Sequence, residues 1–205
     1  MRIAVFAKAP VAGSVKTRLS PLLGDERAAA FHARLVHRTL ATAVESGVGA
    51  VELWCAPDVS HPFFANCASR FGVRLRAQTG ADLGARMNCA FEAVHAEGEP
   101  LVLIGCDCLL LEGSTLREAA GALASNDAVF APAEDGGYVL VGLAAPAPEI
   151  FEGIEWSTSS VMSVTRRRLA AAGLRWKELA IHWDVDLPGD YMRAQQMGLL
   201  DPVDA

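Results

Sequence analysis

Asp107 is the one charged residue in an otherwise apolar run, Leu101–Leu110. The aliphatic residues before it are too few for a helix and predict a central strand buried on both faces. An unpaired charge inside that core would be costly, so we expect Asp107 where the strand emerges at its carboxyl end, beside water or a metal ion. Ligands bind at this edge of open α/β sheets. The structural alternative for the same carboxylate is a turn or a helix cap.

Positive charge is concentrated in one loop, Lys8–Leu19, where Lys8, Lys16 and Arg18 stand among Gly and Pro residues. The loop follows a predicted strand, Arg2–Ala7, and precedes a long predicted helix. Backbone N–H groups between a strand and a helix can bind phosphate, which Lys and Arg neutralise. The spacing matches neither the P-loop NTPase motif nor the dinucleotide-binding glycine motif. We therefore expect a small anionic ligand at this loop.

A third polar segment combines two acids, Glu134 and Asp135, with Gly136 and Gly137. It lies between two predicted strands in a hairpin-like arrangement. Glycine lets backbone come close to a ligand, and an ordinary tight turn is the alternative for this pair. The segment is a candidate second half of the site.

The elements that would position these groups alternate along the chain. The predicted strands are 2–7, 51–55, 73–77, 101–105 and 127–131, followed by an apolar strand within 132–143 and a closing segment at 181–190. Helical patterns separate most of them. This alternation predicts an α/β fold, a three-layer α/β/α sandwich around a mainly parallel sheet.

Length and composition limit the classes of protein. A chain of 205 residues with 52% hydrophobic content predicts one domain, 1–205. The net charge of −6 argues against a nucleic-acid surface. The absence of a long apolar run and of a signal-peptide pattern predicts a cytoplasmic protein without a membrane span. The five cysteines include no CxxC pair, so we expect small buried thiols, including Cys106 and Cys108, rather than disulfides or zinc ligands.

Six segments of the sequence occur in an order that resembles a known family. They are Ala7–Pro10 with Gly13–Leu19, Gln78–Met87, Ile104–Asp107, Pro132–Tyr138, Trp156–Thr158 and Asp184–Asp190. Together they resemble the DUF2064 family, which is associated with glycosyl transfer, over nearly the whole chain. The resemblance implies the GT-A, nucleotide-diphospho-sugar transferase fold. The Lys16–Leu19 loop is also similar to that of 2-phospholactate and molybdenum-cofactor guanylyltransferases.

The resemblance also implies roles for single residues. A nucleotide's phosphates would be held by the loop residues Lys8, Gly13, Lys16, Thr17 and Arg18. Gln78 and Gly80 would contact the base, because an amide offers both a donor and an acceptor. A divalent ion, Mg²⁺ or Mn²⁺, would bind Asp107 together with Asp186 or Asp184, since both ions prefer hard oxygen ligands.

The acceptor side would be formed by the remaining motif residues: Glu134, Asp135, Gly136, Gly137, Tyr138, Trp156, Ser157 and Thr158. Either acid, Asp135 or Glu134, would deprotonate an acceptor. The sequence departs from the family pattern at three positions. Cys106 stands in place of a serine, Leu109 in place of a proline and Leu187 in place of a threonine. These changes affect the turns around the expected metal site rather than the fold.

Three functions fit these residues. The first is a metal-dependent glycosyltransferase with a nucleotide-diphospho-sugar donor and a small-molecule acceptor. The second is a nucleotidyltransferase that joins an NTP to a phosphorylated small molecule and releases pyrophosphate. The third is a non-catalytic nucleotide-binding protein, because a fold does not fix a function.

Overall fold

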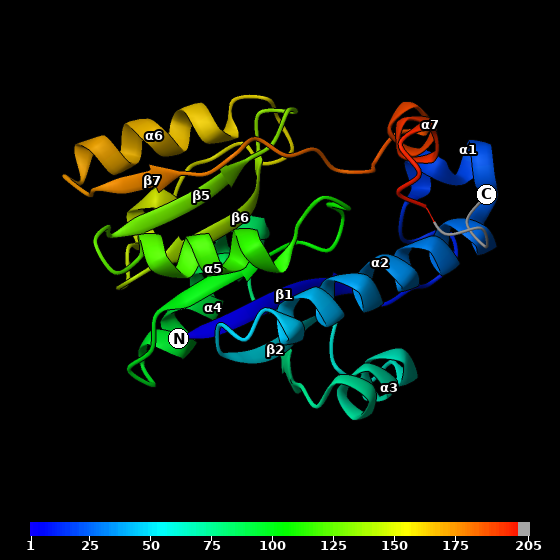
Figure 1. Ribbon diagram of the computed structural model, residues 1–205, viewed down its shortest axis with the longest axis horizontal. Coiled ribbons are helices and arrows are strands. Elements are labelled where there is room, and N and C mark those ends of the chain that lie inside the picture. Colours follow the sequence, from blue (N-terminus) through cyan, green and yellow to red (C-terminus); the bar gives the residue numbers. More distant parts are fainter. Residues whose placement is uncertain (201–205) are drawn as a thin grey trace.

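A computed structural model describes residues 1–200, through which one seven-stranded sheet runs (Figure 1). Its spatial order is β3-β2-β1-β4-β6-β5-β7. The strands are β1 (Arg2–Lys8), β2 (Ala50–Ala56), β3 (Arg74–Ala77), β4 (Leu101–Ile104), β5 (Ala128–Pro132), β6 (Tyr138–Leu143) and β7 (Trp176–Glu178). The expected central strand, β4, lies in the middle of this order and all four of its residues are buried.

The sheet is mainly parallel, as expected. β1 pairs in parallel with β2 and β4, β2 with β3, and β5 with β7. β6 runs antiparallel to β4 and β5, which makes the predicted hairpin after β5. The carboxyl ends of the parallel strands and the amino end of β6 therefore meet at one edge of the sheet.

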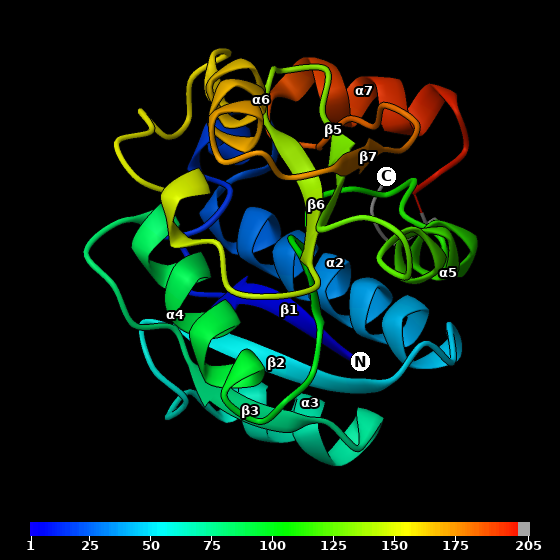
Figure 2. The same cartoon turned by 90° about the vertical axis from the view of Figure 1, so that its left-hand side faces the viewer.

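Helices cover both faces of the sheet and confirm the three-layer α/β/α sandwich (Figure 2). The α-helices are α1 (Ser20–Leu23), α2 (Asp25–Glu45), α3 (Pro62–Phe71), α4 (Leu83–His95), α5 (Gly113–Ala122), α6 (Val161–Ala171) and α7 (Pro188–Gln196), with short 3-10 helices η1 (Thr17–Leu19) and η2 (Pro148–Ile150). Residues of α2, α3 and α5 share one hydrophobic cluster with the sheet, and residues of α4 and α6 share the other.

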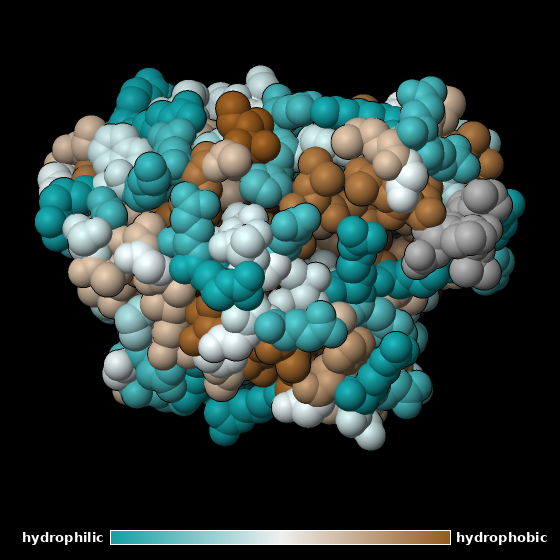
Figure 3. Space-filling model, in the orientation of Figure 1, coloured by the Kyte–Doolittle hydropathy of each residue, from teal (hydrophilic) through white to brown (hydrophobic). Residues whose placement is uncertain are grey.

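A third cluster joins α1, α2 and α7 beyond the end of the sheet. Phe31 of α2 lies edge-on against Tyr191 of α7, with ring centroids 5.2 Å apart. Figure 3 shows hydrophobic side chains gathered beneath α7 on an otherwise mixed surface. This packing holds the C-terminal segment against the loop after β1. No helix of the described residues is long and apolar enough to cross a membrane.

The end of the chain differs from the expected closing strand at 181–190. β7 lies earlier, at Trp176–Glu178, and the later segment contributes one isolated bridge, between Ala133 and His182. Beyond it, the Val185 N–H donates to the Asp107 carbonyl oxygen at 3.0 Å. The segment therefore crosses the edge of the sheet instead of extending it, and this crossing carries Asp184 and Asp186 to the end of β4.

Candidate active site

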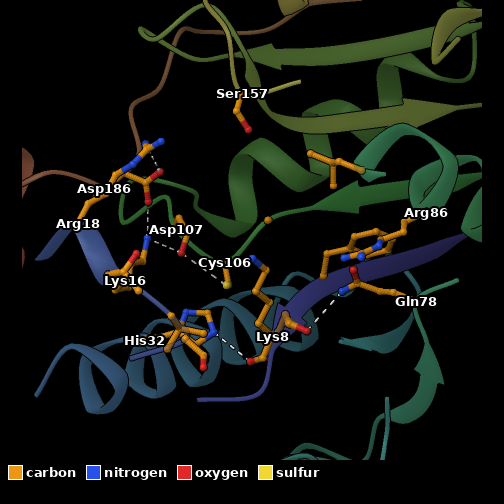
Figure 4. A pocket seen from close by; sticks show the side chains of 17 residues that line it. Lys8, Lys16, Arg18, His32, Gln78, Arg86, Cys106, Asp107, Ser157 and Asp186 are labelled. Carbon is orange, nitrogen blue, oxygen red and sulfur yellow. Dashed lines mark hydrogen bonds and ion pairs between the residues drawn. The ribbon is translucent and has the colours of Figure 1, made fainter. Parts of the chain in front are cut away.

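The polar edge of the sheet contains a cavity of 420 Å³, here called the basic lobe (Figure 4). Its charged lining residues are Lys8, Lys16, Arg18, Arg86, Asp107 and Asp186. Lys8 ends β1, Asp107 follows β4, and Asp186 comes from the crossing segment. The loop after β1 and the strand β4 thus face one another across a single cavity, which has the size of a small-molecule site.

Lys16 connects the two acids of this lobe. Its ammonium Nζ lies 2.7 Å from Oδ1 of Asp107 and 2.7 Å from Oδ1 of Asp186, and it donates to the Val185 carbonyl oxygen at 2.8 Å. Burial opposes this charge, yet the two carboxylates outweigh burial and raise the pKa of Lys16. Burial likewise opposes the charged form of Asp107 by raising its pKa, but the nearby Lys16 ammonium outweighs burial, and the pKa of Asp107 is lowered. Lys16 and Asp107 are therefore both charged at neutral pH.

Lys16 reaches this position through a left-handed backbone conformation, with φ of 48° and ψ of 34°. Ser157, which lines the same cavity, is the other described residue besides glycine with positive φ, at 65°. Such conformations cost free energy in residues with a side chain and concentrate at functional sites. Both strained residues of the described chain face this cavity.

A second cavity of 240 Å³, the acidic lobe, adjoins the first. The two lobes share lining residues, among them Gly105, Ser157 and Asp186. The floor of the acidic lobe is apolar, formed by residues such as Met87 and Val161, and its polar rim includes Asp135 and Asp184. The two cavities are therefore parts of one cleft.

The two lobes differ in charge. Four cations line the basic lobe, whereas the acidic lobe is lined by Asp135, Asp184 and Asp186 and, among the described residues, by no Lys, Arg or His. Burial, together with Asp107 and Asp186, raises the pKa of Asp184 to about 7. An anion fits the first lobe, and a neutral or cationic group fits the second.

Aromatic side chains form one wall of the acidic lobe. Tyr138 and Trp156 meet edge to face, with centroids 6.5 Å apart and planes at 89°. Gly84, in the first turn of α4, packs against Trp156 so closely that an added Cβ would lie 2.6 Å from the ring. Ser157 and Thr158 follow the tryptophan on the same wall. A flat apolar surface beside hydroxyls and carboxylates can bind the face and the edges of a sugar ring.

Most sequence-predicted site residues line one lobe or the other, and four do not. Gly13, Gly80, Gly136 and Glu134 line neither cavity. An added Cβ at Gly136 would lie 2.1 Å from the Ser159 carbonyl oxygen, so this glycine allows close packing against the chain itself rather than against a ligand.

The carboxylates of Glu134 and Asp135 have different surroundings, although the two residues are adjacent in the sequence. The Glu134 carboxylate accepts two hydrogen bonds from Arg193, at 2.7 and 3.1 Å. Asp135 accepts from the Gly137 N–H at 2.9 Å and faces the acidic lobe. Of the two acids considered as the base, Asp135 is the one in the cleft.

Gln78 lines the basic lobe with its amide nitrogen already engaged. That nitrogen donates to the carbonyl oxygens of Trp54, at 2.8 Å, and Ala7, at 3.3 Å. The amide oxygen is then the end offered to a ligand, so the expected donor and acceptor pair is reduced to an acceptor.

Sequence reasoning assigned no role to Arg86, Ser14 or His32, which line the basic lobe. Arg86 and Ser14 lie within the motifs, and Ser14 follows Gly13, which was assigned. His32 lies on α2, far from every motif, and no sequence signal marks it.

The donor set fits a hard divalent ion. Asp107 and Asp186 already converge on one cation, the Lys16 ammonium, and carboxylate oxygens are the ligands that Mg²⁺ and Mn²⁺ prefer. Leu187 lacks the hydroxyl of the family's threonine, and here Asp190 Oδ2 accepts from the N–H groups of Asp186, at 3.1 Å, and Leu187, at 2.7 Å. The Asp190 carboxylate therefore holds the turn that carries Asp186, although residue 187 has no threonine hydroxyl.

Solved structures with this fold include several transferases. A "putative nucleotide-diphospho-sugar transferase" from Desulfovibrio desulfuricans G20 is 28% identical, with a TM-score of 0.88 over 98% of this chain and 88% of that one. The inositol-1-phosphate CTP transferase from T. maritima is 12% identical, with a TM-score of 0.62 over 97% and 94%. A manganese complex of a protein from Mycobacterium tuberculosis H37Rv is 16% identical, with a TM-score of 0.53 over 95% and 98%.

The second and third of these structures share the fold alone, at their low identities. No curated protein matches the sequence. A family model described as "Uncharacterized protein conserved in bacteria (DUF2064)" matches residues 39–158, a range that includes Gln78, Asp107, Asp135 and the Trp156–Thr158 wall. The match covers more than half of the chain, and the protein therefore belongs to the DUF2064 family.

Proposed function

We propose that this protein is a metal-dependent glycosyltransferase that uses a nucleotide-diphospho-sugar donor. The solved relatives support transfer from nucleotides and nucleotide sugars in general. The observation that carries the narrower proposal is the difference in charge along the cleft, where the basic lobe has four cations beside two carboxylates and the described lining of the acidic lobe has three carboxylates and no cation. A diphosphate belongs with the cations, and the sugar attached to it belongs in the acidic lobe.

The acidic lobe argues against a nucleotidyltransferase with a phosphorylated acceptor. A phosphorylated acceptor brings about two negative charges, and such a group needs Lys, Arg or a helix N-terminus beside it. The described lining of this lobe offers carboxylates instead. An uncharged sugar needs hydrogen-bond partners and an apolar face, which the lobe supplies.

The chain's own residues divide the work of the reaction. Lys8, Arg18 and Arg86 would bind the diphosphate, while Lys16 would hold Asp107 and Asp186 in place beside it. Asp135 would accept the proton of an acceptor hydroxyl as its oxygen bonds to the sugar's anomeric carbon. The bond from that carbon to the diphosphate breaks, and the diphosphate leaves intact. Mg²⁺ or Mn²⁺, held by Asp107 and Asp186, would neutralise charge on the departing group.

Phosphorus NMR tests this proposal through the product formed. The protein would be incubated with Mn²⁺ and a panel of nucleotide sugars, and in parallel with NTPs plus sugar phosphates. We expect free nucleoside diphosphate from at least one nucleotide sugar and a loss of turnover in Asp107→Asn. Asp135→Ala should reduce turnover far more than binding, whereas the neighbouring Glu134→Ala should keep most of it. Pyrophosphate from NTPs, with no diphosphate from any nucleotide sugar, would establish the nucleotidyltransferase instead.

A further inference from the structure

Three different metal-ligating side chains meet below the basic lobe. The ligand atoms of His32, Cys106 and Asp107 all lie within 4.8 Å of one another. His32 comes from α2, whereas Cys106 and Asp107 follow β4. Figure 4 shows the imidazole and the thiol at the base of the cavity that all three residues line.

His32 has an unused lone pair. Its Nε2 lies 3.0 Å from the Lys8 carbonyl oxygen, and only a protonated nitrogen can donate to that acceptor. The other nitrogen, Nδ1, is buried and has no hydrogen-bond partner. With the proton on Nε2, Nδ1 keeps a lone pair that is free to act as a ligand. Buried polar atoms nearly always have a partner, so this one calls for an explanation.

We propose that His32, Cys106 and Asp107 form a binding site for a thiophilic divalent ion such as Zn²⁺. Imidazole, thiolate and carboxylate are the three ligand types of protein zinc sites, and sites with three protein ligands leave a fourth position open. Here that position faces the basic lobe. The sequence contains no CxxC pair that would indicate a zinc site. In the structure, the other two ligands beside Cys106 are His32, from α2, and the adjacent Asp107.

The ligand types separate this site from the Mg²⁺ or Mn²⁺ site at Asp107 and Asp186. Hard ions take carboxylates and water, whereas a thiolate selects softer ions. The Cys106 thiol donates to Asp107 Oδ1 across 3.7 Å. A metal ion would displace this thiol proton, which leaves to solvent as the metal–sulfur bond forms.

The two sites share Asp107, so an ion in one site competes for the carboxylate that the other site uses. A thiophilic ion would compete with Lys16, whose ammonium lies 2.7 Å from Asp107 and keeps Asp186 and the Val185 carbonyl oxygen as partners. On the proposed function, Zn²⁺ here would inhibit transfer by occupying the carboxylate that holds the catalytic ion. The binding itself does not depend on that function.

Cobalt absorption tests the site without nucleotide or turnover. Co²⁺ would be titrated into the metal-free protein, followed by Zn²⁺ in competition, with thermal unfolding as a check on folding. We expect one Co²⁺ per chain with visible bands of a four-coordinate site and a near-ultraviolet thiolate-to-cobalt band. Cys106→Ser should abolish that band and weaken Zn²⁺ binding by on the order of 100-fold, while Cys89→Ser, a half-buried cysteine on α4, should change neither.

His32→Gln is the second variant, because its amide can still donate to the Lys8 carbonyl oxygen while the Nδ1 ligand is lost. It should weaken Zn²⁺ binding at least about tenfold. His37→Gln, at another histidine of α2, is its control. Co²⁺ binding without a thiolate band, or a band that survives Cys106→Ser, would overturn the proposal, even if glycosyl transfer were demonstrated.

Discussion

Arg18 and Lys16 belong to one loop, yet the structure gives them different roles. The Lys16 side chain is 4% exposed and holds two carboxylates, whereas Arg18 is 65% exposed and lies 4.0 Å from Asp186. An exposed pair of this kind contributes little to stability, so the guanidinium remains available to a ligand.

Arg18→Ala should weaken nucleoside diphosphate binding about tenfold, since a charge-assisted contact contributes roughly 1.5–3 kcal/mol. The free energy of unfolding should change by less than about 0.5 kcal/mol. Isothermal titration calorimetry and urea unfolding measure the two quantities. Arg167→Ala, an exposed arginine on α6, is the matched control and should affect neither. An unchanged dissociation constant for Arg18→Ala would place the phosphates elsewhere.

Asp184 gives the metal-free protein a pH-dependent stability. Burial, Asp107 and Asp186 raise its pKa from 3.8 to about 7, so between these values the folded state binds the proton more than the unfolded state does. Stability from this group is therefore present at low pH and is lost as the pH rises towards about 7.

Asp184→Asn removes this titration and keeps the side chain's size. Measured by urea unfolding with a chelator present, the stability of the variant relative to the wild type should increase as the pH rises from 5 to 8, by on the order of 1–3 kcal/mol. A relative stability that falls over this range would show that the charged carboxylate is the favoured form.

At the scale of elements, the start of α4 sets the wall of the acidic lobe. Gly84→Ala would place a Cβ 2.6 Å from the Trp156 ring and push that ring from its place. We expect transfer from a nucleotide sugar to fall at least about tenfold, with the affinity for the nucleoside diphosphate alone nearly unchanged. Gly121→Ala on α5, where an added Cβ meets nothing within 4 Å, should instead stabilise the protein by about 1 kcal/mol. If Gly84→Ala lowered the affinity for the nucleoside diphosphate as much as it lowered transfer, the separation of the lobes would be contradicted.

The elements also show what sequence can predict. The aliphatic run of β4 and the alternation of helices and strands were sufficient for the sandwich, because burial on both faces leaves few other arrangements. β7 was missed because three residues, Trp176–Glu178, are too short for a periodic signal. The long expected strand at 181–190 failed because its apolar residues pack against α2 and α7 rather than into the sheet.

The site was predicted only in part, for a related reason. The strand ends identified Asp107 and the loop residues that line the basic lobe, since the carboxyl ends of parallel strands share an edge. Asp135 lies in the cleft, whereas Glu134 pairs with Arg193. This difference depends on tertiary packing, and two acids that are adjacent in the sequence do not reveal it. His32 reaches the site from a helix face, where a histidine looks like any buried residue.

For the whole molecule, the central claim is that the cleft binds a diphosphate in its basic lobe and a neutral sugar in its acidic lobe. The most direct measurement compares two ligands that differ in one charge. After a screen identifies the base that binds with Mn²⁺, calorimetry would compare its diphospho-glucose with its diphospho-glucuronic acid, which carries a carboxylate at C6.

The acidic lobe predicts that the neutral sugar binds at least about tenfold more tightly, because the uronate would face Asp135 and Asp186 across a partly buried cavity. Asp135→Asn should reduce the difference in affinity between the two nucleotide sugars, because it removes one carboxylate. It should not weaken binding of the free nucleoside diphosphate. Equal binding of the two ligands, or tighter binding of the uronate, would contradict the division of the cleft and with it the assignment of the sugar to the acidic lobe.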